Sequence, residues 1–203
     1  RGHALMGAGL LYTLIAPALT TNPWWGIEPA IVFGPPLLDT LLLAFLVPAA
    51  LAFAASRRLY TRQRLAARIY AGAGGLLTLA WALLATRRGF HSADMSGTVV
   101  GLFESACYAL VFLAAALAIA FTARVRAARD AERPFTHDLV VISRGCAWFG
   151  LIVAGYILLV ARHPWWGGQD PTTTNALSTL LAVLAQLVAV VLTLFLGRAL
   201  SRS

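Results

Sequence analysis

Long apolar stretches alternate with short polar ones along the whole chain. Six of them approach the roughly 20 residues that a membrane-spanning helix needs. We expect helices at about 4–20, 38–56, 69–86, 101–123, 140–161 and 174–197. Apolar residues run continuously within these stretches, which favours helices over the alternating strands of a membrane barrel. The pattern therefore predicts an all-α integral membrane protein with six transmembrane helices. Pro48 lies inside the second helix and predicts a kink there.

The polar stretches indicate that the six helices form three tandem helix-pair repeats. A shift of 65 residues places Asp39 on Glu104, and a shift of 141 places the Pro-Trp-Trp-Gly of 23–26 on that of 164–167. Each repeat has a helix, a polar loop opened by an aromatic residue, a second helix and an arginine-rich exit. We predict one membrane domain in which the repeats cover residues 1–66, 67–136 and 137–203.

Composition agrees with a membrane protein. Of the 203 residues, 60% are hydrophobic and 12% are charged, and the mean hydropathy is +0.77. A soluble domain has about 25% charged residues. The formal charge of +8 comes from sixteen arginines with no lysine. These arginines lie at the ends of apolar stretches, which is typical of membrane anchoring. We therefore expect membrane lipids as partners and no nucleic acid.

The arginines also predict an orientation. Thirteen of the sixteen fall on the side where the second helix of each repeat ends, and three, Arg87, Arg88 and Arg162, fall on the other side. Because cytoplasmic loops carry an excess of positive charge, we place the arginine-rich side and both termini in the cytoplasm. The cytoplasmic basic residues include Arg57, Arg58, Arg62, Arg64, Arg124, Arg126 and Arg129.

Aromatic residues mark the opposite, extracytoplasmic boundary. Indole and phenyl rings favour the membrane–water interface because they are large and, for indole, amphipathic. This explanation is favoured over a site where a ligand stacks on the rings. The predicted interfacial anchors are Trp24, Trp25, Phe90, Trp165 and Trp166.

Two segments carry a family resemblance. "GPPLLDTLLLAFLVPAALAFAASRRL" and "RRGFHSADMSGTVVGLFESACYALVFLAAALAI" resemble a large bacterial family of polytopic membrane proteins, the domain of unknown function two-three-three-nine. The resemblance covers most of the chain and implies a bacterial inner-membrane location. Family members are longer, so it also implies a fragment or a reduced relative. The chain departs from the family in its paired tryptophans and in Asp39, where Asn is common. The resemblance brings no established activity.

Candidate chemistry is limited to a few ionisable residues. Nucleotide-binding, serine-hydrolase and zinc-protease motifs do not occur in the sequence. Asp39 and Glu104 each stand where an apolar helix begins, so they either cap their helices or line a shared pocket at the membrane border. His91 and Asp94 are three residues apart in a loop, a spacing too unspecific to predict a metal site. We expect no cofactor and no metal.

Two functions remain open from the sequence. The first is a non-enzymatic module, a scaffold or transport-path component of a larger membrane assembly with other membrane-protein subunits as partners. The second is a membrane-embedded transferase that acts on lipid-linked envelope precursors at the extracytoplasmic face. Such an enzyme would use acidic residues near its loops, for which Asp39, Glu104 and Asp94, with His91, are the candidates.

Overall fold

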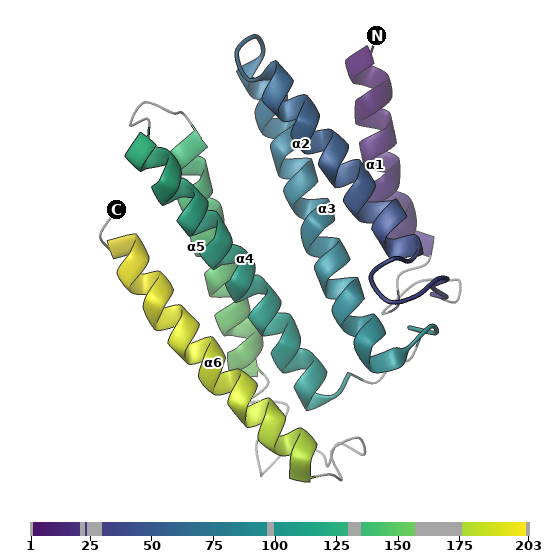
Figure 1. Ribbon diagram of the computed structural model, residues 1–203, viewed down its shortest axis with the longest axis vertical. Helices are drawn as coiled ribbons and strands as arrows, with labels where there is room; N and C mark the ends of the chain where they lie inside the picture. The colour runs from purple at the N-terminus through teal and green to yellow at the C-terminus, as the bar shows by residue number, and fades with distance from the viewer. Residues whose placement is uncertain are drawn as a thin grey trace. The chain divides into compact units, whose positions relative to one another are not determined.

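In a computed structural model, the described residues are 2–20, 23, 30–96, 100–129, 135–156 and 176–201. They form the helices shown in Figure 1, which are α1 (Gly2–Thr20), α2 (Val47–Leu59), α3 (Arg64–His91), α4 (Leu102–Arg129), α5 (Phe135–Tyr156) and α6 (Ala176–Ser201). A π-helical segment, η1 (Leu42–Leu46), leads directly into α2. Over these residues the predicted all-α class is confirmed, and the single β-type pairing is an isolated bridge between Ile31 and Asp94.

Three helical stretches among the described residues are long and apolar enough to cross a membrane. They are Leu42–Leu59, Arg64–His91 and Phe103–Val125. Shorter apolar stretches lie in α1, α5 and α6, at Ala4–Ala16, Leu139–Val153 and Thr179–Phe195. A membrane protein with three candidate spans is thus established, and the full set of six spans stays a prediction.

The chain divides into two compact units, Arg1–Val99 and Val100–Ser203. The boundary falls between the two helices of the predicted second repeat, residues 67–136. In unit 1 the main helix contact is between α2 and α3. In unit 2, α4 packs against α5 and α6. The three-repeat arrangement stays a prediction, because packing into units does not test a relationship in sequence.

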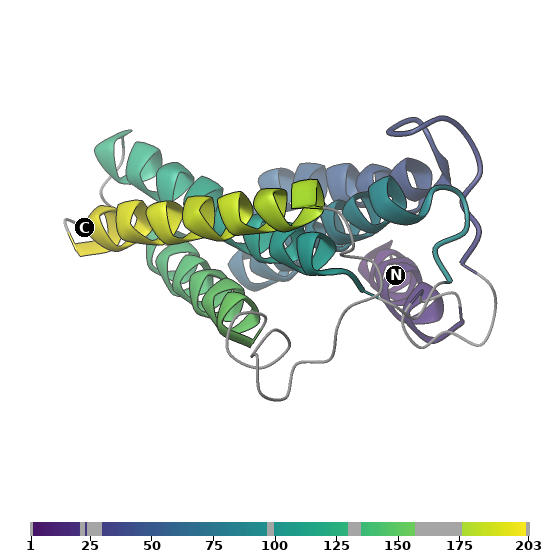
Figure 2. The ribbon, with the colours of Figure 1, turned by 90° about the horizontal axis from the view of Figure 1, so that it is seen from below.

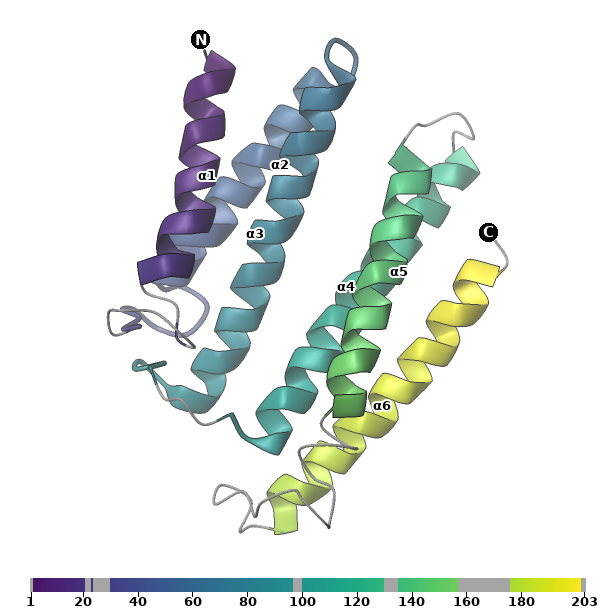
Figure 3. The same ribbon diagram turned by 180° about the vertical axis from the view of Figure 1, so that it is seen from behind.

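In unit 1, α2 and α3 run antiparallel and side by side (Figures 1 and 3). Gly74 of α3 makes close packing possible, because a Cβ there would lie 3.1 Å from the Phe53 ring and 3.2 Å from the Ala49 carbonyl oxygen. The Ser56 hydroxyl donates to the Ala67 carbonyl at 2.8 Å. Small residues therefore bring the helices together, as is common in membranes.

The disturbance predicted at Pro48 takes the form of a π turn. Proline has no N–H and its ring crowds the preceding turn, so a regular helix is not continuous through it. The Val47 N–H donates to the Leu42 carbonyl, five residues back, which widens the turn just before Pro48. Such π turns are one way in which helices absorb a proline.

In unit 2, α4 packs against both α5 and α6, as Figure 2 shows. Gly150 is the close point between α4 and α5, since a Cβ there would lie 3.1 Å from Leu113 and 3.2 Å from the Ala109 carbonyl oxygen. The Phe112 and Phe149 rings meet beside it, with centroids 4.4 Å apart. Cys107 and Cys146 are free thiols. The core of the unit consists of Leu113, Ala116, Ala120, Ala147 and Ala189.

Candidate functional site

Backbone pairing in unit 1 brings together two segments that are distant in sequence. The Val32 N–H donates to the Ala93 carbonyl at 2.9 Å, and the Met95 N–H donates to the Ala30 carbonyl at 3.1 Å. The Ala30 N–H donates to the Ser96 hydroxyl oxygen at 2.9 Å. This short antiparallel contact fixes loop 30–41, which precedes η1, against the segment after α3. It places Asp39 beside the last turn of α3.

A tight turn within loop 30–41 presents Asp39 to the helix. The Leu38 N–H donates to the Pro35 carbonyl at 3.1 Å, and the Thr40 N–H donates to the Phe33 carbonyl at 3.0 Å. Gly34 has a φ of +104° and a Cβ there would lie 2.9 Å from the Leu38 carbonyl oxygen. Only glycine fits this position without strain. The turn therefore depends on Gly34.

Asp39 uses both carboxylate oxygens. Oδ1 accepts from the Leu42 N–H at 3.0 Å, which is the contact of a helix N-cap residue with the third residue of its helix. Oδ2 pairs with Nη1 of Arg88, and Nη2 of Arg88 donates to the Gly34 carbonyl. Asp39 and Arg88 are 5% and 9% exposed, so the pair is buried. We call Asp39, Arg88 and the Gly34 carbonyl the arginine clamp.

Arg87 secures the neighbouring segment. Its side chain is fully buried, with 0% exposed, and its Nε donates to the Met95 carbonyl at 2.9 Å. Buried arginines are rare unless their donors are paired. The two adjacent arginines thus hold two different loops at one end of unit 1. From the sequence, both arginines count as charges on the minority side and as two of the three cations available to Asp39 and Glu104. A doublet at the end of an apolar helical stretch was a further signal for buried pairing.

Asp94 and His91 lie at the same end of the unit. His91 is the last residue of α3, and Asp94 is exposed. Hydrogen bonds from the backbone N–H and the side chain of Ser96 lower the pKa of the Asp94 carboxyl below its usual range, and the nearby His91 lowers it further. Within the described ranges, no three His, Cys, Asp or Glu side chains are grouped as a metal site would need.

Glu104 belongs to unit 2 and lies in the first turn of α4. It is 2% exposed and accepts a hydrogen bond from the Tyr108 hydroxyl, one helical turn further on. An acid in the first turn is also favoured by the helix dipole. Asp39 belongs to unit 1, so the shared pocket predicted for the two carboxylates stays a prediction.

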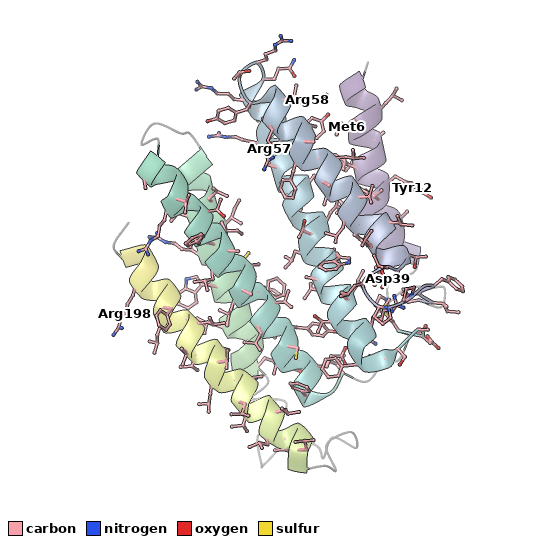
Figure 4. The ribbon with its side chains drawn as sticks, viewed as in Figure 1. Met6, Tyr12, Asp39, Arg57, Arg58 and Arg198 are labelled. Carbon is pink, nitrogen blue, oxygen red and sulfur yellow. The ribbon has the colours of Figure 1, made fainter. Side chains whose placement is uncertain are left out.

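Only some of the residues predicted at the two membrane boundaries lie within the described part of the chain. Trp24, Trp25, Trp165 and Trp166 lie outside the described residues, and Phe90 is an exposed residue in the last turn of α3. Figure 4 shows Arg57 and Arg58 at the end of unit 1 opposite to Asp39. Arg126 and Arg129 belong to α4, but their side chains lie outside the described set. The other predicted cytoplasmic basic residues, Arg57, Arg58, Arg62, Arg64 and Arg124, are exposed.

Helices of this length and apolarity, with large apolar side chains on their exposed surfaces, define the chain as a membrane protein. It belongs to the family described as predicted membrane protein (DUF2339), whose match covers residues 1–134. This range contains all of unit 1 and α4, and it confirms the resemblance seen in the sequence. None of the curated proteins and none of the solved structures matches the chain.

Proposed function

We propose that the protein is a non-catalytic scaffold module of a larger assembly in the bacterial inner membrane. The observation that carries this proposal is the engagement of Asp39. A transferase needs a carboxylate that is open to its substrate and to proton transfer. Asp39 instead caps a helix through one oxygen and binds Arg88 through the other. This geometry favours a residue that holds the fold over one that reacts.

The scaffold has six spans, arranged as three helix pairs. The exposure of α6 supports the inclusion of the shorter apolar helices among the spans. Large apolar side chains cover the exposed side of α6, for example Leu187, Val188 and Val190, whereas Ala185 and Ala189 on its other side are buried. An exposed helix face that is this apolar is suited to lipid or to a protein partner within the membrane. These surfaces fit membrane lipids and the other subunits of an assembly.

Both termini lie in the cytoplasm in this proposal. The arginines that opposed this orientation include Arg87 and Arg88, which are buried and bonded within unit 1. Arginines that are paired inside the fold carry no information about the side of the membrane on which a loop lies. The exposed arginines that remain, such as Arg57, Arg58 and Arg198, support the cytoplasmic placement.

Site-specific crosslinking tests the scaffold role. A photoreactive residue at Leu187 or at Leu194 in α6, both exposed apolar positions, is introduced into the chain in its native membrane. We expect each to capture one discrete integral membrane protein, which also co-purifies in fixed ratio. The matched control is the same residue at Thr61, exposed in the polar turn between α2 and α3, which should not capture that protein.

The transferase is the alternative outcome. If the purified, folded chain alone transfers a group from a lipid-linked saccharide, and Glu104→Gln abolishes the transfer while helical content is retained, the scaffold proposal is wrong. Asp39→Asn is less informative for this purpose, because the change disturbs the arginine clamp as well as any chemistry.

A further inference from the structure

The surface of loop 30–41 is apolar although only its last two residues, Thr40 and Leu41, are helical. Its exposed large side chains are Ile31, Phe33, Leu37 and Leu38, of which Phe33 and Leu38 are 69% and 74% exposed. Pro35 and Pro36 at its tip are exposed as well. Four large apolar groups in so short a loop are costly in water, at about 25 cal/mol per Å² of apolar surface. The loop is therefore suited to an apolar environment.

The one charge of loop 30–41 is buried. Asp39 is the single charged residue between positions 30 and 41, and it is buried against Arg88. A buried, paired carboxylate presents no isolated charge to a low-dielectric environment, where an unpaired one would cost several kcal/mol. The arginine clamp thus removes the main obstacle to contact between this loop and lipid.

Backbone bonding suits the same environment. Six N–H groups between positions 30 and 42 donate within the unit, and the two prolines have no N–H. The Gly34 and Ala30 carbonyls accept from Arg88 and Met95. Irregular backbone with unsatisfied groups does not occur in the hydrocarbon region, because lipid offers no hydrogen bonds. With these groups bonded within the unit, the loop can sit at the border of that region, where headgroups and water reach the remaining groups.

The loop surface is continuous in sequence with an exposed apolar side of a candidate span. Leu43, Val47 and Leu51 are exposed at four-residue spacing along the span Leu42–Leu59, and such residues share one face of a helix. This stripe begins five residues after Leu38. Loop and helix thus offer successive parts of one apolar surface, of which the helical part belongs to a candidate membrane span.

We propose that loop 30–41 is an interfacial anchor that inserts Phe33, Leu37 and Leu38 into one leaflet of the bilayer, with the arginine clamp keeping its charge covered. The partner is the lipid surface, at the boundary between headgroups and acyl chains, where apolar groups enter by about 5–10 Å. This inference does not depend on the scaffold role, because it concerns how unit 1 sits in its membrane.

Spin labels measure the depth of the loop directly. The full chain with Cys107→Ser and Cys146→Ser carries one new cysteine, from Phe33→Cys or Leu38→Cys, and is reconstituted in nanodiscs of phosphatidylcholine and phosphatidylglycerol. Collisions with oxygen, which concentrates in lipid, are compared with those of a water-soluble nickel chelate. We expect an oxygen-to-nickel ratio several-fold higher at positions 33 and 38 than at the control Thr61→Cys.

Two other results would overturn the proposal. A ratio at positions 33 and 38 equal to that at position 61 would place the loop in water. Low accessibility to both reagents would mean that protein, not lipid, covers the loop. The role of the clamp has its own test in Arg88→Gln combined with the label at position 33. With helical content retained, nickel accessibility should rise several-fold, and an unchanged value would show that the clamp does not maintain insertion.

Discussion

Unit 1 contains two Arg-Arg pairs near helix C-termini, and they have opposite fates. Arg57 and Arg58 in the last turn of α2 are exposed, whereas Arg87 and Arg88 near the end of α3 are buried. The difference lies in the segment after each helix. After α2 the chain closes a short turn with its own backbone, through donation from the Gln63 N–H to the Leu59 carbonyl at 2.7 Å. This turn does not fold back over the arginines, which stay exposed to solvent or to the headgroups.

After α3 the chain provides acceptors instead. The segment 93–96 pairs with loop 30–41, and this pairing places the Met95 and Gly34 carbonyls and the Asp39 carboxylate around the two guanidinium groups. Five donors in a rigid fork suit arginine to such convergent acceptors. An arginine pair at the end of an apolar helix therefore either marks the cytoplasmic side of the membrane or forms part of a core. The second case requires acceptors from another segment of the fold.

The largest expected effect is the contrast between Arg88→Ala and Arg58→Ala. Loss of Arg88 leaves Asp39 buried without its cation, and breaking a buried pair in this way costs about 3–5 kcal/mol. Loss of the exposed Arg58 should change stability by less than about 0.5 kcal/mol. The free energy of unfolding in mixed micelles, followed by circular dichroism at increasing dodecyl sulfate, measures both.

The double variant Asp39→Asn with Arg88→Gln serves as the control for that contrast. Asparagine keeps the helix cap, and no unpaired charge remains. The double variant should therefore be more stable than Arg88→Ala. If Arg88→Ala and Arg58→Ala unfold alike, the arginine clamp does not stabilise unit 1 and the comparison between the two pairs fails.

A smaller effect is expected from the turn that presents Asp39. Gly34→Ala forces a side chain onto a residue with φ of +104°, and its Cβ would meet the Leu38 carbonyl oxygen at 2.9 Å. Such strain costs about 1–3 kcal/mol. Gly75→Ala in α3 is the matched control, because nothing lies within 4 Å of its Cβ position and alanine favours helix by about 1 kcal/mol. Equal unfolding free energies for the two variants would contradict the role of the turn.

The helices could be predicted from the sequence because continuous apolar stretches determine them locally. Their ends were less predictable. Helix α3 was expected at 69–86 but covers Arg64–His91, since Arg64 and Arg68 remain helical while exposed, and Arg87 and Arg88 find acceptors. The cap at Asp39 was one of the two explanations that the sequence offered. Its partner Arg88 was only one of three candidate cations, with Arg87 and Arg162. The sequence could not choose among them, because 49 residues separate Asp39 from Arg88 and the pairing of loop 30–41 with segment 93–96 brings the two together.

The smallest expected effect concerns Asp94, an exposed residue that forms the bridge with Ile31. Its pKa lies below the ordinary value of 3.8, chiefly because Ser96 donates hydrogen bonds to the carboxylate. A lowered pKa in the folded state means that the carboxylate stabilises the fold above the unfolded pKa. This contribution is lost as the pH falls below about 4 and through the folded pKa.

Ser96→Ala removes the side-chain donor to Asp94 and the acceptor of the Ala30 N–H. The pKa of Asp94 should then rise toward 3.8, and the acid-dependent part of the melting temperature should shrink. A carbon-13 titration of the Asp94 carboxyl measures the pKa, and melting curves at falling pH measure the stability. Asp94→Asn should flatten the same acid region and lower the stability at neutral pH by the same small amount, because the contribution it removes is the one that the carboxylate makes above the unfolded pKa. If the pKa of Asp94 stays low in Ser96→Ala, the backbone N–H of Ser96 alone maintains the shift. The serine hydroxyl then makes no contribution to the ionisation of Asp94.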